Sequence, residues 1–372
     1  MGFNTWNTFG PDINEQLIRE TADAMVDRGL LAAGYEYLVI DDCWSLHDRD
    51  PITHKIVADP KKFPNGMKAV ADYVHSKGLK FGMYSCAGIR TCAGYPGSFD
   101  HEFLDAETFA EFGCDFLKYD FCYLPPKVDG NVLYNRMGMA LKACGREILL
   151  SACNWGRDES EKWMRSTGAH MYRSTYDIND SFKCIKDIAM SQVDSLCYSV
   201  PGCFNDLDML TVGMYGKGNV ANGGCENDEY YTHFALWCLF SSPLMIGCDI
   251  RNVSDEAIKI LTNKELIRIN QDPEGRPAYV AYRHPYDDER MVFVKQLSNN
   301  EMAVGFFNMS DDPKPKAVPF TPYAAGLSPN CGYSLELTDI ETGEVVGRVR
   351  DSIDFSIEGH GCRIFRAKVV KN

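Results

Sequence analysis

One segment of the chain reads Asp115-Phe116-Leu117-Lys118-Tyr119-Asp120-Phe121-Cys122-Tyr123-Leu124, a largely apolar run that carries charged residues near its end. In a β-strand alternate side chains share a face, so Lys118, Asp120 and Cys122 are expected to point the same way. An ammonium two positions from a carboxylate favours the ionised form of that carboxylate. An ionised Asp at a strand end is suited to act as a nucleophile, although a structural ion pair would give the same local pattern.

Strand-like and helical segments alternate on both sides of this segment, up to about residue 270. The strand-like runs are residues 2–6, 35–41, 80–85, 115–120, 147–153, 170–175, 203–206 and 244–249, and the helical patterns include residues 15–31, 67–77, 131–144, 180–190 and 230–239. Eight strands with intervening helices over about 250 residues predict an α/β fold, a (β/α)8 TIM barrel. A doubly wound open sheet is the alternative, and the lack of a G-x-G-x-x-G motif after any early strand disfavours its dinucleotide-binding version.

The pattern changes after the segment Asn270-Gln271-Asp272-Pro273-Glu274-Gly275. Apolar and polar residues then alternate in short runs separated by Asn- and Gly-containing turns, at residues 291–297, 302–308, 333–337, 345–349 and 362–370. Such hairpins predict a small antiparallel β-sandwich. We therefore expect a barrel domain over residues 1–275 and a C-terminal antiparallel β domain over residues 276–372.

Composition narrows the classes of function. Of the 372 residues, 45% are apolar, and the formal net charge of −14 disfavours nucleic acid and anionic membranes as partners. No apolar run approaches the roughly 18 residues of a membrane span. The N-terminus shows no secretion signal, which predicts a cytoplasmic protein, although a trimmed leader would leave the same picture. The fifteen cysteines include no C-x-x-C pair, which favours buried thiols over a disulfide framework or a metal site. No metal or other cofactor is expected.

Acidic, basic and aromatic residues recur where the predicted strands end, and barrel enzymes assemble their sites at those ends. The positions are Trp6, Asp41, Asp42, Trp44, Tyr84, Lys118, Asp120, Asn154, Trp155, Arg173, Asp177, Asp206 and Asp208. One acidic residue at such a place is explained by helix capping. The recurrence together with tryptophans, whose faces pack on sugar rings, indicates a pocket for a hexose. A calcium or magnesium site is the alternative, and Lys118 and Arg173 disfavour it because they would repel a cation.

A site that cleaves a glycoside needs two carboxyl groups in different surroundings. Asp120, beside Lys118, is expected to stay ionised. Asp177 lies between a predicted strand and a predicted helix, so it is expected on a loop where it can face a leaving group. Asp180 is expected to cap the helix that begins at Ser181.

Six motifs occur in order: MGFNTW at residues 1–6, DDCW at 41–44, TCAGYPGS at 91–98, KYDFCY at 118–123, NDLDML at 205–210 and INQDP at 269–273. Together they resemble glycoside hydrolase family 27, the α-galactosidases and α-N-acetylgalactosaminidases. The resemblance implies a (β/α)8 barrel with a C-terminal β domain and a retaining mechanism. It implies that Asp120 is the nucleophile and Asp177 the acid/base.

The resemblance also implies a set of sugar contacts. Asp41 and Asp42 match the residues that hold O4 and O6 of galactose, Lys118 matches the lysine at O3 and O4, and Arg173 matches the arginine near O2. The other residues expected in the substrate pocket are Trp6, Trp44, Tyr84, Cys92, Cys122, Asn154 and Asp208. Cys92 and Cys122 match cysteines that are disulfide-linked in secreted members; in a cytoplasmic protein we expect two thiols, with a bond as the alternative.

Three features depart from the family pattern. Cys43 lacks the upstream partner found in animal members, the segment 204–210 lacks the usual Trp and Pro, and Asn154 replaces a common Glu. We expect Asn154 to hydrogen-bond O2 of the sugar, and Arg157 to leave little room for an N-acetyl group.

We therefore expect an exo-acting α-galactosidase whose partner is a small carbohydrate, with homo-oligomerisation left open. The alternatives within the family are an α-N-acetylgalactosaminidase and a β-L-arabinopyranosidase. The alternative from another class is a non-catalytic sugar-binding protein.

Overall fold

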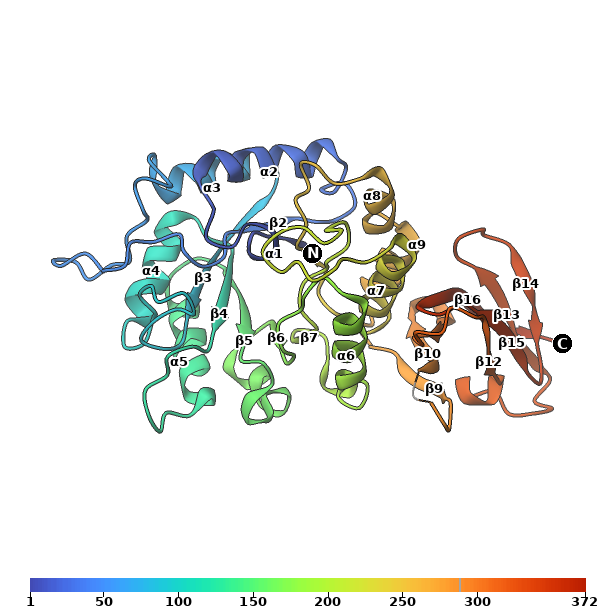
Figure 1. The fold of residues 1–372 in the computed structure, drawn as a ribbon. Coiled ribbons are helices and arrows are strands. Elements are labelled where there is room, and N and C mark those ends of the chain that lie inside the picture. Colours follow the sequence, from blue (N-terminus) through green and yellow to red (C-terminus); the bar gives the residue numbers. More distant parts are fainter. Residues whose placement is uncertain (288) are drawn as a thin grey trace.

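The barrel consists of eight short parallel strands in a computed structural model that describes residues 1–287 and 289–372 (Figure 1). The strands are β1 Gly2–Asn4, β2 Tyr37–Val39, β3 Lys80–Cys86, β4 Phe116–Asp120, β5 Leu149–Cys153, β6 Met171–Arg173, β7 Phe204–Asp206 and β8 Met245–Ile246. Their order in the sheet is β7-β6-β5-β4-β3-β2-β1-β8, so each strand from β1 to β7 pairs with the next one in sequence. The predicted barrel is confirmed.

A short contact closes the sheet between its two end strands. Leu210, just after β7, donates its amide to Met245 O at 2.7 Å and accepts the amide of Gly247 at 2.9 Å. These bonds continue the parallel pairing onto β8, so the sheet closes on itself and leaves no open edge.

Apolar side chains fill the interior of the barrel, which explains why its strands are short apolar runs. Val39, Phe116, Met171 and Met245 are buried together there. Gly82 in β3 is required by this packing, because a Cβ at that position would lie 2.6 Å from Val39 Cγ2.

Helices cover the barrel on the outside (Figure 1). They are α1 Trp6–Phe9, α2 Glu15–Asp27, α3 Gly66–Ser76, α4 Glu102–Phe112, α5 Gly130–Ala143, α6 Phe182–Gln192, α7 Asn227–Leu239, α8 Asp255–Leu261 and α9 Lys264–Asn270. Between β5 and β6 the described chain forms the 3₁₀ turns η1 Arg157–Lys162 and η2 Met164–Thr167 in place of an α-helix. A further 3₁₀ turn, η3 Leu196–Tyr198, precedes β7.

The expected capping role of Asp180 is wrong. Ser181 is the N-cap of α6, and its hydroxyl accepts the amide of Cys184. Asp180 is instead fully buried and accepts hydrogen bonds from the Tyr230 hydroxyl and the Gly216 amide. It therefore ties the loop before α6 to the loop before α7.

The C-terminal domain is an antiparallel β-sandwich. Its strands are β9 Tyr279–Arg283, β10 Arg290–Leu297, β11 Glu301–Asn308, β12 Lys316–Phe320, β13 Tyr333–Asp339, β14 Val345–Val349, β15 Ile353–Ile357 and β16 Gly361–Lys371, with the 3₁₀ turns η4 Ser298–Asn300 and η5 Pro322–Ala325. Six strands form one sheet in the order β14-β13-β16-β11-β10-β9, and β12 pairs with β15 in a second sheet. The predicted boundary at residues 275/276 falls in the segment that connects α9 to β9.

Helix α7 lies between the barrel and the six-stranded sheet (Figure 1). Phe240, just after α7, packs edge-to-face on Phe293 of β10, and one continuous apolar core joins the two domains. The fully buried Lys295 of β10 donates to Cys238 O at 3.1 Å and to Ser241 Oγ at 2.8 Å, at the C-terminal end of α7. Among the described residues, none of the helices is long and apolar enough to cross a membrane.

Candidate active site

A pocket of about 220 Å³ opens at the carboxyl ends of the barrel strands. This volume is below the roughly 300–1,000 Å³ of sites for drug-sized ligands, which suits a single small molecule. The lining residues are Trp6, Asn7, Asp41, Asp42, Tyr84, Cys92, Lys118, Asp120, Cys122, Trp155, Arg173, Asp177, Ile178, Asp208, Met209 and Val220. Most of the residues expected in the site are therefore brought together.

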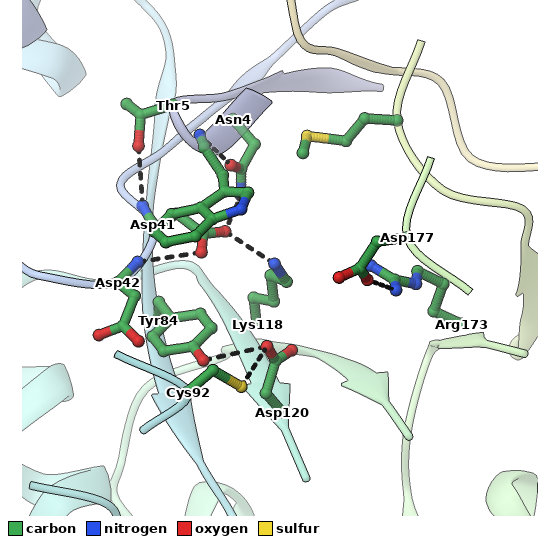
Figure 2. Close-up of polar contacts among 12 residues, drawn as sticks. Asn4, Thr5, Asp41, Asp42, Tyr84, Cys92, Lys118, Asp120, Arg173 and Asp177 are labelled. Carbon is green, nitrogen blue, oxygen red and sulfur yellow. Dashed lines mark hydrogen bonds and ion pairs between the residues drawn. The ribbon is translucent and has the colours of Figure 1, made fainter. Parts of the chain in front are cut away.

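Asp41 and Asp42 follow β2 and form one wall of the pocket (Figure 2). Asp41 Oδ2 accepts hydrogen bonds from Asn4 Nδ2 at 2.7 Å and from Lys118 Nζ at 2.9 Å. Asp42 accepts the amide of Ala93 at 2.9 Å, and burial raises the pKa of its carboxyl. Both carboxylates are thus fixed by their own neighbours and can accept hydrogen bonds from sugar hydroxyls.

Asp120 ends β4 at the floor of the pocket. Its Oδ2 accepts the Tyr84 hydroxyl at 3.0 Å, whereas its buried Oδ1 has no hydrogen-bond partner among the described residues. Burial raises the pKa of Asp120 to about 6; Lys118 opposes this rise, and the Asp41 carboxylate adds to it. Lys118 therefore favours the ionised form of Asp120 as expected, but the ammonium forms its ion pair with Asp41, and burial raises the pKa of Asp120 all the same.

Asp177 lies on the loop between β6 and α6, on another side of the pocket from Asp120 (Figure 2). Its side chain is 72% exposed and pairs with Arg173, the last residue of β6. Its Oδ1 also accepts the indole N–H of Trp155 at 2.9 Å. Solvent reaches the side chain, but the pocket walls partly shield its carboxyl, which would raise the pKa of Asp177. The Arg173 guanidinium and the Trp155 hydrogen bond outweigh this shielding and hold the pKa below its ordinary value.

Asp208 links the loop that carries Asp177, between β6 and α6, to the end of β7. It adopts the uncommon φ of 86°, and its backbone carbonyl accepts the indole N–H of Trp237 in α7 at 2.7 Å. Its Oδ2 accepts the amide of Ile178 at 2.9 Å and lies 3.2 Å from Arg173 Nη1. Asp208 therefore fixes the residue next to Asp177, as well as lining the pocket.

Cys92 and Cys122 form a disulfide at the rim of the pocket. The expectation of two thiols is therefore corrected. Cys92 lies in the loop after β3 and Cys122 follows β4, and Cys92 Sγ lies 3.5 Å from Asp120 Oδ2. The bond closes a 30-residue loop beside the end of β4.

Trp44 and Asn154 do not contribute to the pocket as expected. Trp44 is 3% exposed, donates its indole N–H to Tyr84 O at 2.9 Å and packs behind the pocket wall against Phe109. Asn154 is fully buried, and its amide donates to Arg157 O at 2.8 Å and accepts from Gly156 N at 3.2 Å. Both ends of this amide are thus used to shape the loop that carries Trp155, so Asn154 is not available to a sugar hydroxyl.

Four lining residues were not identified from the sequence: Asn7, Ile178, Met209 and Val220. Asn7 follows the motif at residues 1–6 and Met209 lies within the motif at residues 205–210, so their closeness to these motifs could have identified them as pocket residues. Val220 lies in a glycine-rich loop with no motif and could only be placed by the fold. The described residues contain no group of three or more His, Cys, Asp or Glu side chains that could hold a metal ion.

A (β/α)8 barrel that gathers carboxylates, a lysine, an arginine and tryptophan indoles around a pocket for one small ring defines a glycoside hydrolase. Residues 7–272 match the family described as alpha galactosidase A, and residues 287–367 match the alpha galactosidase C-terminal beta sandwich domain. The chain belongs to the α-galactosidase family.

Relatives from three kingdoms support this assignment. Alpha-galactosidase 3 of Arabidopsis thaliana is 39% identical over 366 residues, which is 98% of this chain and 80% of that protein. Alpha-galactosidase A of Cellvibrio japonicus is 42% identical over 323 residues, which is 84% of this chain and 76% of that protein. The structure of the α-galactosidase from Saccharomyces cerevisiae with raffinose superposes with a TM-score of 0.85 at 29% identity, covering 100% of this chain and 97% of that one.

Proposed function

We propose that the protein is an exo-acting α-galactosidase that hydrolyses terminal α-linked galactose with retention of configuration. The observation that carries the proposal is the unpartnered Oδ1 of Asp120 on the pocket floor, with Asp177 on another side of the same pocket. A pocket of about 220 Å³ leaves room for one terminal sugar. Raffinose, the ligand named for the yeast relative, carries such a terminal α-galactose.

The first chemical step transfers the galactosyl group to Asp120. A lone pair of Asp120 Oδ1 forms a bond to C1 of the sugar, the bond from C1 to the glycosidic oxygen breaks, and Asp177 gives a proton to that oxygen. In the second step a water molecule gives a proton to Asp177 while its oxygen bonds to C1. Asp120 then leaves as a carboxylate.

The proton for the leaving group is carried by Oδ2 of Asp177, because Oδ1 already accepts the Trp155 indole N–H and the Arg173 guanidinium. In the free enzyme this guanidinium favours the ionised carboxylate. A sugar hydroxyl that draws Arg173 toward itself would raise the pKa of Asp177 and so prepare it to act as an acid. Substrate binding and protonation of Asp177 are coupled in this proposal.

The preference for galactose over N-acetylgalactosamine rests on the relatives from Arabidopsis thaliana and Cellvibrio japonicus, which are α-galactosidases by name. Asn154 no longer supports it, because its amide is used within the loop. A panel of nitrophenyl α-galactoside, α-N-acetylgalactosaminide and β-L-arabinopyranoside tests the preference. We expect kcat/KM to favour the galactoside by at least about a hundredfold; comparable values would contradict it.

The role of Asp120 is tested by Asp120→Gly. We expect kcat/KM to fall by a factor on the order of 10⁴ or more, and added azide to restore turnover of an activated galactoside. Retention through Asp120 predicts a β-galactosyl azide product, and an α-configured azide would contradict it. Asp351→Gly, an exposed position in the C-terminal domain, is the control and should leave activity unchanged.

A further inference from the structure

A second, smaller cavity of about 30 Å³ lies inside the barrel, beneath the catalytic pocket. Lys118, Arg173, Asp208 and Met209 line both spaces and so separate the cavity from the pocket. On its other side the cavity meets the apolar side chains that fill the barrel, among them Phe116. It therefore lies between the floor of the pocket and the apolar interior, and the mechanism proposed above gives it no role.

Two buried polar side chains line this cavity without a complete set of partners. Asp206, the last residue of β7, is 7% exposed, and its Oδ1 accepts the amide of Asp208 at 2.9 Å. Its Oδ2 has no hydrogen-bond partner among the described residues. Ser151 of β5 is 4% exposed, and its hydroxyl has no partner in the described part of the chain either. Buried polar groups are almost always hydrogen-bonded to protein or to ordered water, so this pair points to a ligand in the cavity.

Lys118 supplies a third group at the cavity. Its ammonium carries three N–H donors, one of which binds Asp41 at 2.9 Å (Figure 2), and the centre of the Tyr84 ring lies 5.3 Å from Nζ. Two donors remain on a residue that lines both the pocket and the cavity. Arg173 differs, because it already forms ion pairs with two carboxylates.

The charges around the cavity favour water over an ion. Lys118 and Arg173 would repel a cation, and Asp206 and Asp208 would repel an anion. Burial and the Asp208 carboxylate raise the pKa of Asp206 to about 7, against the opposing charges of Arg173 and Lys118, so both forms of its carboxyl occur near neutral pH. Water can donate to the ionised form and accept from the protonated one. A volume of about 30 Å³ is sufficient for one water molecule.

We propose that the cavity holds one water molecule, through which Asp206 and Ser151 act as positioning residues for Lys118. This inference rests on the proposed function, in which Lys118 meets a hydroxyl of the sugar. The ammonium sits on a flexible four-carbon stem. Asp41 holds one N–H and the water holds a second, which leaves the third for the sugar. The ammonium is thereby ordered before the sugar binds, so binding costs less conformational entropy.

Steady-state kinetics on nitrophenyl galactoside test the role of the water with Ser151→Ala and Asp206→Ala. We expect KM and the inhibition constant of galactose to rise about threefold in the first variant and about tenfold in the second, with kcat within about threefold of the parent. The double variant should resemble Asp206→Ala alone, because both residues act through the same water. The control is Asp272→Ala, which removes a carboxyl of similar burial, 6% exposed, outside the pocket and should leave both constants unchanged.

Additive effects in the double variant would overturn the proposal, because the two residues would then act independently. A lower kcat at unchanged KM would also overturn it, since that result means only less folded enzyme. A crystal structure of the parent tests the water without any variant: it should lie within hydrogen-bond distance of Asp206 Oδ2, Ser151 Oγ and Lys118 Nζ. A dry cavity in an active parent would overturn this inference alone, whereas a parent without galactosidase activity would overturn the proposed function.

Discussion

Lys118 and Lys295 are both withdrawn from solvent, but the groups around them differ. Lys118 lies at the catalytic pocket, 2.9 Å from Asp41. Burial alone would lower its pKa, yet the carboxylates of Asp120 and Asp41 raise it well above its ordinary value. Lys295 lies between the two domains, donates to a carbonyl and a hydroxyl, and burial lowers its pKa to about 8.

The difference separates a functional charge from a structural one. At the pocket, carboxylates hold the ammonium in its charged form, and under the proposed function it is available to a sugar hydroxyl. At the domain interface, the end of helix α7 supplies partial charges that are too weak to offset the full cost of burying an ammonium. Lys118 should therefore control activity, and Lys295 should control the stability of the domain contact.

Exchange of each lysine for methionine gives the largest contrast. Lys118→Met removes a group from the substrate pocket and leaves Asp41 without its cation, so kcat/KM should fall by about 10³. Lys295→Met lies outside the pocket and should keep kcat/KM within about twofold of the parent, because distant sites act independently. Steady-state assays on nitrophenyl galactoside measure both variants, and equal losses of kcat/KM would contradict separate roles for the two lysines.

The pH dependence of kcat/KM should be set by the pKa values of the pocket carboxyls and should not depend on Lys295. The proposed mechanism needs Asp120 ionised and Asp177 protonated, but the pKa of Asp120 is raised to about 6 while that of Asp177 is lowered. In this reversed order the active form is lost as pH rises above the higher pKa, so kcat/KM should fall about tenfold per pH unit above pH 6. Lys295→Met should give the same profile, and a plateau extending well above neutral pH would contradict the assignment.

The pH dependence of the free energy of unfolding should, in contrast, change when Lys295 is replaced. The pKa of Lys295 is about 8 in the folded protein and near its ordinary value of 10.5 when unfolded, so between these values the unfolded chain binds more protons. The stability of the parent relative to Lys295→Met should then rise with pH, by about 2 kcal/mol between pH 8 and pH 9.5. Denaturant unfolding of both proteins measures the difference, and a pH-independent difference would mean that Lys295 is not a buried charge.

The smallest effect concerns two tryptophans of one loop. Trp155 donates its indole N–H to Asp177, whereas Trp163 donates to the Asp158 carbonyl. Trp155→Phe should lower kcat/KM about tenfold on melibiose and less on nitrophenyl galactoside, which needs little protonation of the leaving group. Trp163→Phe is the matched control, and an equal loss on both substrates would remove Trp155 from the positioning of the acid.

The sequence was sufficient for the barrel and the sandwich because apolar periodicity is a local property. Residues 115–120 were expected as a strand and form β4 at Phe116–Asp120. The segment between β5 and β6 was beyond such reasoning, because Asn154 and the left-handed residues after it bend the chain into 3₁₀ turns.

The sequence predicted most of the residues that line the pocket, but not which of their side chains form ion pairs with one another. Motifs located Asp41, Lys118 and Asp120. A two-residue spacing could not show that the Lys118 ammonium of β4 forms its ion pair with Asp41, which follows β2 on the far side of β3. Trp44 lies in a motif yet faces away from the pocket, since the direction of a side chain after a strand end depends on the packing of the loop.

The claim that Asp120 forms a galactosyl-enzyme is tested most directly by trapping that intermediate. A fluorinated α-galactosyl fluoride, which glycosylates the nucleophile readily and hydrolyses slowly, is incubated with the enzyme, and the digested protein is examined by peptide mass spectrometry. We predict one fluorogalactosyl group on Asp120. A label on Asp177 or Asp41, or an unlabelled enzyme that releases β-galactose first from an α-galactoside, would contradict it.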